Sequence, residues 1–272
     1  VAELVIGEMI LLMRGIPHRS TVAHKGEWLK NAHNSYEVRG KTVGIVGYGH
    51  IGSQTGILAE AMGMNVLYYD IERKLSLGNA QPTKTLKELL GKSDFVTLHV
   101  PQTDQTKNMI GRKEIEQMKK GSHLLNASRG NVIVIEALAD ALKSKHLLGA
   151  AIDVFPKEPK SKGEKFESPL QNLDNVILSP HIGGSTIEAQ ENIGVDAAQK
   201  LIDYSNLGDT SATVNFPKVS LPALEKGNRY LHIHENKPGV MKAINELFAE
   251  NNINITGQYL QTDSQIGYVV FD

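Results

Sequence analysis

Three short segments carry charged side chains of the types that together can oxidise an alcohol. They are "NASRG" with Arg129, "DVFPKEP" with Glu158 and "SPHIGG" with His181, and each follows an apolar run. Oxidation by hydride transfer needs a base for the hydroxyl proton, and histidine changes its charge near neutral pH. A neighbouring carboxylate favours the imidazolium and fixes the ring tautomer. A guanidinium can hold a substrate carboxylate and polarise the carbonyl that forms. These three residues are therefore candidate catalytic residues.

Each of the three also has a plainer interpretation. Arg129 precedes a turn glycine, and Glu158 lies between a lysine and a proline. His181 is compatible with an exposed loop, a helix cap or a metal ligand. The sequence has no H-E-x-x-H or similar spacing, so we predict no metal site. It has no cysteine, which excludes disulfides, Cys-ligated zinc and a cysteine nucleophile.

The segment "GYGHIG", residues 47 to 52, has the pattern G-x-G-x-x-G. It follows the strand-like run "TVGIVG" and begins the helical stretch "HIGSQTGILAEAMG", which is the context that a dinucleotide loop requires. Gly47 permits the tight turn, Gly49 lets a pyrophosphate approach the backbone, and Gly52 lets helix and strand pack closely. The free N–H groups at the start of the helix then bind the phosphates.

An acidic residue follows the glycine loop at the spacing that selects the cofactor. Asp70 ends the strand-like run "NVLYYD", 18 residues after Gly52. Such an acid accepts hydrogen bonds from the adenosine ribose and repels a 2′-phosphate, which favours NAD over NADP. Arg73 and Lys74 lie close by and weaken this exclusion.

Apolar runs and helical stretches alternate from about residue 42, which predicts an α/β fold with a parallel sheet and helices on both faces. Ligands of such Rossmann-type, doubly wound sheets bind at the carboxyl ends of the strands, so the three candidate segments are expected to meet at one edge. The strand-like runs are "TVGIVG", "NVLYYD", "DFVTLHVP", "HLLNAS", "LGAAIDVF" and "NVILSP".

The pattern changes after residue 186. We expect an NAD-binding domain over 1–186, a helix over 187–206 that returns toward a substrate domain, and a linker over 207–228 rich in Gly, Ser and Pro. The pattern over residues 229–272 predicts a second, small α+β unit that is truncated before the domain is complete. Since the chain starts inside an apparent helix and ends inside an apparent strand, we expect sequence to be missing at both ends.

Composition narrows the classes of partner. The formal net charge is −1, which does not favour nucleic acid or an anionic membrane. The apolar opening "VAELVIGEMILLMRG" is interrupted by Glu3 and Glu8 and is shorter than the ~20 residues that span a bilayer, so it reads as an amphipathic helix. The absence of cysteine fits the cytoplasm.

These segments resemble the D-isomer-specific 2-hydroxyacid dehydrogenases, and in particular the members that act on 3-phospho-D-glycerate. The resemblance lies in "GIVGYGHIGSQTGILAEAMGM", "LHVPQTDQTKNMIG", "LLNASRGNVI", "GAAIDVFPKEP" and "LSPHIGGSTIEAQENIG". "HIHENKPGVM" and "NINITGQYLQT" extend it into a truncated ACT domain, the serine sensor of those members. It implies NAD-dependent oxidation of 3-phospho-D-glycerate to 3-phosphooxypyruvate, the first step of L-serine synthesis, with feedback inhibition by L-serine.

The resemblance also implies roles for individual residues. Arg129 would bind the substrate carboxylate and carbonyl, His181 would be the acid/base, and Glu158 would pair with His181. L-serine would bind at His234, Asn236 and Asn254. The NAD contacts would come from Gly47, Gly49, His50, Ile51, Gly52, Asp70, Ala127, Ser128, Arg129, Asp153, His181, Ile182, Gly183 and Gly184.

The resemblance further implies a homodimer or homotetramer, formed through the first helix up to "GEWLKN" and through paired ACT units. Two other functions stay open at this point. One is a different D-2-hydroxyacid dehydrogenase, for example one acting on 2-hydroxyglutarate. The other is a non-catalytic regulator that senses NAD. We expect a fragment of this extent to bind NAD without turning over.

Overall fold

The computed structural model describes residues 1–161, 163–224 and 226–272. Contacts between residues divide the chain into two compact units, Val1–Thr186 and Ile187–Asp272. Lys162, in the expected NAD-binding domain, and Glu225, in the expected linker, lie outside the described residues.

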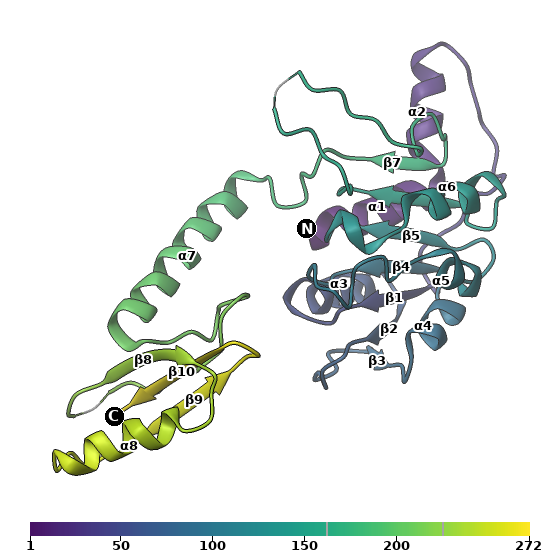
Figure 1. The fold of residues 1–272 in the computed structure, drawn as a ribbon. Coiled ribbons are helices and arrows are strands. Elements are labelled where there is room, and N and C mark those ends of the chain that lie inside the picture. The colour runs from purple at the N-terminus through teal and green to yellow at the C-terminus, as the bar shows by residue number, and fades with distance from the viewer. Residues whose placement is uncertain (162, 225) are drawn as a thin grey trace. The chain divides into compact units, whose positions relative to one another are not determined.

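The first unit contains a seven-stranded parallel sheet with the strand order β3-β2-β1-β4-β5-β6-β7 (Figure 1). The order reverses direction between β1 and β4, and dinucleotides bind at such a switch point. The predicted α/β doubly wound fold is therefore confirmed. The strands are β1 (Thr42–Val46), β2 (Asn65–Tyr69), β3 (Gln81–Pro82), β4 (Phe95–Leu98), β5 (His123–Asn126), β6 (Gly149–Ile152) and β7 (Val176–Leu178).

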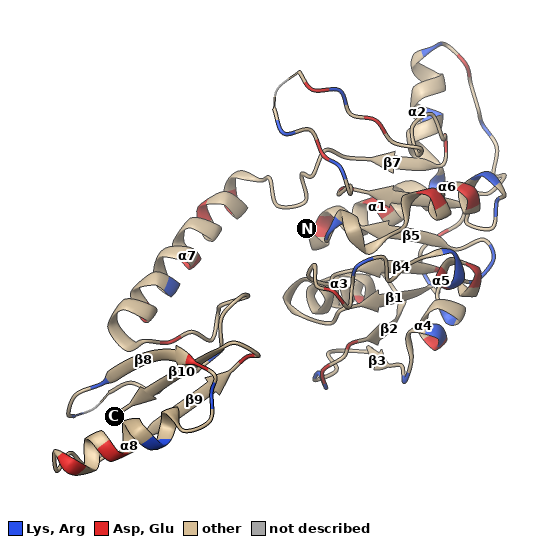
Figure 2. Ribbon diagram, in the orientation of Figure 1, with Lys and Arg blue, Asp and Glu red and all other residues tan. Residues whose placement is uncertain are grey.

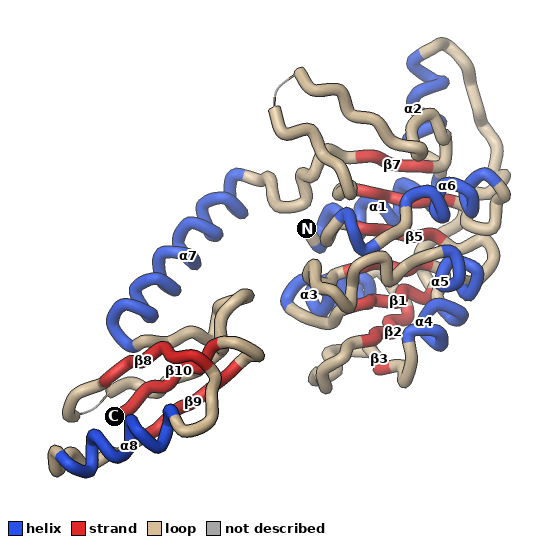
Figure 3. The backbone as a smooth tube through the Cα atoms, in the orientation of Figure 1, coloured by secondary structure: helices blue, strands red, loops and turns tan. Residues whose placement is uncertain are grey.

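Helices cover both faces of this sheet (Figure 3). On one face, Met9 and Ala59 pack with buried strand residues such as Ile45. On the other face, Leu90 and Leu138 pack with a different set of buried strand residues. The predicted opening helix is α1, whose apolar side is buried in the first of these layers. The helices are α1 (Ala2–Arg14), α2 (Ile16–His24), α3 (His50–Ala61), α4 (Leu86–Lys92), α5 (Arg112–Gln117), α6 (Ile135–Lys143) and the 3₁₀ turn η1 (Gly130–Val132).

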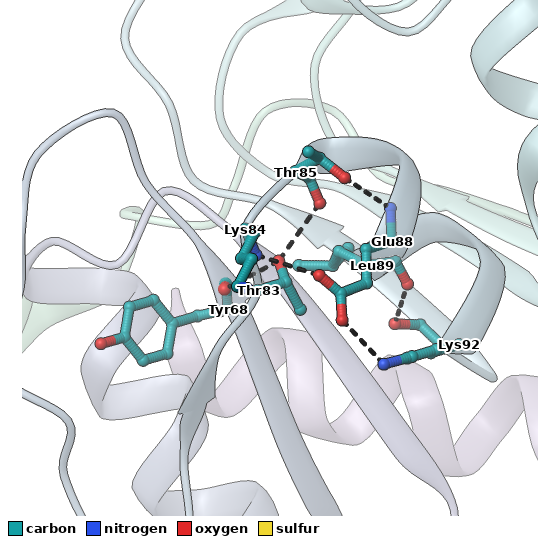
Figure 4. Close-up of polar contacts among 8 residues, drawn as sticks. Tyr68, Thr83, Lys84, Thr85, Glu88, Leu89 and Lys92 are labelled. Carbon is teal, nitrogen blue, oxygen red and sulfur yellow. Dashed lines mark hydrogen bonds and ion pairs between the residues drawn. The ribbon is translucent and has the colours of Figure 1, made fainter.

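Local hydrogen bonds determine where α4 begins, after the short strand β3. The hydroxyl of Thr85 accepts from the N–H of Glu88 at 3.1 Å, which is a standard N-terminal cap (Figure 4). The Glu88 carboxylate also pairs with Lys92 one turn later at 2.7 Å. Just before the helix, the N–H of Thr83 donates to the carbonyl of Tyr68 at 2.8 Å. The Thr83 bond attaches the segment before α4 to β2, two residues before Asp70.

The second unit contains an antiparallel sheet with the strand order β8-β10-β9, as expected for a small α+β domain. Helix α8 packs on this sheet through Phe248, whose ring lies 4.9 Å from that of Phe271. The elements are α7 (Ile187–Leu207), β8 (Tyr230–Glu235), α8 (Val240–Glu250), β9 (Gln258–Thr262) and β10 (Ile266–Phe271).

The segment between α7 and β8, expected as a linker, packs against this sheet. Val219 and Leu221 are buried together with Tyr268 and Val270 of β10. The hydroxyl of Tyr268 donates to the carbonyl of Gly208 at 2.7 Å. The Gly, Ser and Pro residues of the segment therefore form turns that follow the surface of the sheet.

Figure 2 shows Lys and Arg interspersed with Asp and Glu along both units, as a net charge of −1 allows. Within the described ranges, every helix is too short or too polar to cross a lipid bilayer.

Candidate active site

The glycine loop joins β1 to α3, and its glycines have different structural roles. Gly47 has a φ of +90°, and a Cβ there would lie 2.4 Å from the carbonyl oxygen of His99. A Cβ on Gly52 would lie 2.1 Å from the carbonyl oxygen of Gly47. A Cβ on Gly49 would meet no atom within 4 Å. Protein packing therefore requires Gly47 and Gly52, whereas Gly49 leaves open space in front of the first turn of α3.

That open space fits a pyrophosphate. Gly49 is the N-cap of α3 and has no side chain to occupy the free N–H groups of the first turn. His50 and Ile51, which begin the helix, are exposed there. The donors, the space and the positive end of the helix match the requirements of the cofactor.

Asp70 follows β2, at the neighbouring position on the same edge of the sheet. One carboxylate oxygen accepts from the N–H of Tyr48 at 2.8 Å, and the other accepts from the N–H of Glu72 at 2.9 Å. These bonds fix the carboxylate and leave a further lone pair on each oxygen for a ribose hydroxyl. Asp70 lines a cavity of about 710 Å³ together with Arg73 and Lys74.

His181 and Glu158 are in direct contact. Nδ1 of His181 lies 2.9 Å from Oε2 of Glu158, while Oε1 of Glu158 accepts from the N–H of Phe155 at 2.9 Å. Since an ionised carboxylate only accepts, the proton lies on Nδ1, and Nε2 is left to take or give one. Beside the pair is a cavity of about 320 Å³, lined by Phe155, Phe166 and Pro180 among others.

The surroundings of Glu158 favour its charged form. Burial alone would raise the pKa of Glu158, but the hydrogen bonds from His181 and from the N–H of Phe155 outweigh it and lower that pKa. Glu158 is therefore an anion over the pH range in which a histidine titrates.

The backbone at His181 is unusual, and Asp153 stabilises it. His181 has a φ of +56°, in the left-handed region that few non-glycine residues occupy. Its N–H donates to the carbonyl of Asp153 at 2.8 Å. The Asp153 carboxylate accepts from the hydroxyl of Ser179 at 2.6 Å, from the N–H of Ile182 at 2.9 Å and from the N–H of Gly183 at 2.8 Å. Asp153 is thus mainly engaged in shaping the turn that carries His181.

Arg129 follows β5, and β6 lies between β5 and β7 in the sheet. Asn126 at the end of β5 is aligned with Ile152 and, one strand further, with Leu178 at the end of β7, so these two strand ends lie about 10 Å apart. Arg129 is exposed, and its guanidinium donates to the carbonyl of Ser128 at 2.7 Å. Ala127 and Ser128, in the same loop, are half-buried and buried. Gly184 is half-buried after Gly183.

One buried acid of this unit was not recognised as a site residue in the sequence. Glu8 of α1 is 3% exposed, and its Oε1 has no hydrogen-bond partner among the described residues. Burial, together with the charge of Asp153, raises the pKa of Glu8 from 4.5 to about 7. Its place in an apolar stretch was visible in the sequence, but its burial was not.

Replacing Glu8 with glutamine is expected to remove a loss of stability at high pH. The unfolded chain releases the Glu8 proton near pH 4.5, whereas the folded chain keeps it until about pH 7. Stability therefore falls as the pH rises through this window, by about 3 kcal/mol in total, because the unfolded state binds fewer protons. Urea unfolding at pH 4.5 and pH 8 measures the difference, with Glu3→Gln, an exposed site on the same helix, as control. A pH dependence unchanged by Glu8→Gln would contradict the prediction.

The three residues expected to bind L-serine lie in separate parts of the second unit. His234 lies in β8, and Asn254 lines a cavity of about 310 Å³ that includes Tyr230 at the start of that strand. His234 lies four residues along β8 from Tyr230. The amide of Asn236 donates to the carbonyl of Asp263 at 2.8 Å.

No group of three or more His, Cys, Asp or Glu residues that could bind a metal is found in the part of the chain that the structure describes.

Comparison with known proteins covers both units. Residues 6–183 match the model of the D-isomer specific 2-hydroxyacid dehydrogenase, NAD binding domain, and residues 231–272 match an AHAS small subunit-like ACT domain. The whole chain is 61% identical to D-3-phosphoglycerate dehydrogenase of Escherichia coli K12 and 58% identical to that of Haemophilus influenzae. The chain spans 66% of the length of each of these curated relatives.

Among solved structures, D-lactate dehydrogenase of Aquifex aeolicus, complexed with NAD and lactic acid, has a TM-score of 0.68 and 29% identity. The match covers 75% of this chain and 65% of that chain.

Proposed function

The chain belongs to the D-isomer specific 2-hydroxyacid dehydrogenase family, whose NAD binding domain matches residues 6–183, and on this basis we propose its reaction. The proposed reaction is the NAD-dependent oxidation of 3-phospho-D-glycerate to 3-phosphooxypyruvate. The observation that carries the proposal is the contact between His181 and Glu158 at the edge of the sheet where the NAD loop lies. The high identity to curated D-3-phosphoglycerate dehydrogenases supports this substrate over other 2-hydroxy acids.

Each site residue has a separate role in the proposed reaction. Bound NAD supplies the hydride acceptor. Arg129 binds the substrate carboxylate and polarises the carbonyl as it forms. Nε2 of His181 takes the hydroxyl proton during oxidation and returns it during reduction. Glu158 fixes the ring tautomer and compensates the charge that His181 gains.

We further propose that Gly49, His50 and Ile51 lie against the cofactor phosphates and that Asp70 binds the adenosine ribose. The segments from Ala127 to Arg129 and from His181 to Gly184, with Asp153, would line the nicotinamide half. The openness at Gly49 and the fixed carboxylate of Asp70 support this division.

Regulation by L-serine is the second part of the proposal. The ACT domain match supports an amino-acid effector. Since Asn254 lines a cavity whose described lining does not include His234 or Asn236, we propose that a serine site combining them is completed by a second copy of the chain. We also propose that the protein is a homodimer or homotetramer and that it acts in the cytoplasm.

A two-substrate assay of the full-length protein tests the proposed function. NADH consumption is measured with 3-phosphooxypyruvate and with 2-oxoglutarate, each with and without L-serine. We expect turnover of the first substrate and its inhibition by serine. Preference for 2-oxoglutarate would indicate the alternative dehydrogenase, and no turnover of either would leave an NAD-sensing regulator. Activity insensitive to serine would remove the effector assignment alone.

Replacing Asp70 with alanine is expected to reduce the preference for NAD over NADP. The substitution removes the acceptor for the ribose hydroxyls and the charge that repels a 2′-phosphate, and it leaves Arg73 nearby. The ratio of kcat/KM for the two cofactors measures the effect. Glu72→Ala, an exposed acid in the same cavity, is the matched control. An unchanged ratio in Asp70→Ala would place the ribose elsewhere.

A further inference from the structure

Asn126, the last residue of β5, contacts the loop that carries Arg129 through every polar atom of its side chain. Asn126 is 1% exposed. Its Oδ1 accepts from the N–H of Ser128 at 3.0 Å and from the hydroxyl of Ser128 at 2.8 Å. Its Nδ2 donates to the carbonyl of Arg129 at 3.0 Å. All of these bonds are with Ser128 and Arg129, whose backbone determines the position of the Arg129 side chain.

The other side of this loop is fixed by backbone contact. Gly130 is buried, and a Cβ on it would lie 2.0 Å from the carbonyl carbon of Phe155. The loop therefore lies directly against the segment that leads to Glu158. Between these two attachments Arg129 is exposed.

We propose that Asn126 is the positioning residue for Arg129, so that its amide fixes the place from which the guanidinium reaches the substrate carboxylate. The inference rests on the role given to Arg129 in the proposed function. Without the amide, the N–H of Ser128 and the carbonyl of Arg129 lose buried partners, and the loop rearranges to regain them. A bidentate contact tolerates little of such a displacement, because both of its hydrogen bonds depend on one orientation.

The amide group itself is required. It offers an acceptor toward Ser128 and a donor toward the Arg129 carbonyl. An aspartate keeps the first contact but places a second acceptor against that carbonyl. Asn126→Asp therefore removes the donor while adding a buried charge, and Asn126→Ala removes both contacts.

Asn175 supplies a matched control. Its side-chain amide donates to the carbonyl of Leu148 at 3.2 Å, just before β6 begins and thus at the opposite edge of the sheet. Asn175→Ala removes one comparable hydrogen bond without touching the Arg129 loop.

The test is a double-mutant cycle in the full-length protein with NADH and 3-phosphooxypyruvate. We expect Asn126→Ala and Asn126→Asp to lower kcat/KM about 30-fold, mainly through the KM for 3-phosphooxypyruvate. In the Arg129→Ala background, Asn126→Ala should lower kcat/KM by less than about 3-fold. Equal losses in both backgrounds, or kinetics like those of Asn175→Ala, would overturn the inference.

A second measurement does not depend on the substrate. Amide hydrogen exchange at residues 127–130 should accelerate about 10-fold or more in Asn126→Ala and stay unchanged in Asn175→Ala. Unchanged exchange in both variants would overturn the positioning role. Inactivity of the wild type with accelerated exchange would instead contradict the proposed function and leave the loop contact supported.

Discussion

Replacing His181 with asparagine is expected to lower turnover by about 10²-fold or more while the Kd for NADH stays near the wild-type value. Asparagine cannot exchange a proton near neutral pH, so the hydroxyl proton loses its acceptor. Asparagine also adopts positive φ more readily than most residues, and the backbone at His181 has a φ of +56°. The turn built by Asp153 is therefore preserved, and so is the glycine loop.

Steady-state kcat and a fluorescence titration with NADH measure the two quantities separately. Glu158→Gln is the companion variant, because a glutamine retains a hydrogen bond to Nδ1 but lacks the charge; we expect its kcat to fall between those of the wild type and His181→Asn. An unchanged kcat in His181→Asn would exclude His181 from catalysis. A large rise in the Kd for NADH would show that the variant damages the cofactor site.

Replacing Arg229 with methionine is expected to destabilise the unit Ile187–Asp272 by about 3–5 kcal/mol. Arg229 and Asp272 are 5% and 10% exposed in their side chains, and two nitrogens of the guanidinium contact the carboxylate at 2.5 and 2.6 Å. The guanidinium also donates to the carbonyls of Leu207 and Pro222. Its loss leaves a buried carboxylate without its cation and releases the end of α7 and the segment before β8.

Chemical denaturation followed by circular dichroism measures this effect. The control is Lys237→Met, which removes an exposed ion pair with Glu235 and should change stability by less than about 1 kcal/mol. A loss of similar size in both variants would contradict the account of Arg229 as a buried connection.

The fold was predictable where local patterns determine it. The apolar runs that become β1, β4 and β5 are buried on both faces, so their composition alone marks them as inner strands. The glycine loop was predictable because each glycine has a role that its local sequence context indicates: a tight turn, the approach of a pyrophosphate to the backbone, or close packing of helix and strand. The segment between α7 and β8 looked like a linker because its turns are visible in the sequence, whereas the burial of Val219 and Leu221 depends on β10.

The types of the candidate site residues were predictable from the sequence. The residues that hold their loops in place were not. The topology places Arg129, Glu158 and His181 after neighbouring strands, and that follows from alternation. The roles of Asn126 and Asp153 in shaping two loops depend on distances between backbone groups. Asparagine is common where a strand ends in a turn, so the residue type of Asn126 alone gave no signal.

The most direct test of the account is a single turnover of the full-length protein. Enzyme saturated with NADH is mixed with excess 3-phosphooxypyruvate, and the loss of bound NADH is followed in wild type and in His181→Asn. The account predicts complete oxidation of the bound NADH by wild type and a rate lower by about 10²-fold or more in the variant. Equal rates in the two proteins, or no oxidation by wild type, would contradict it.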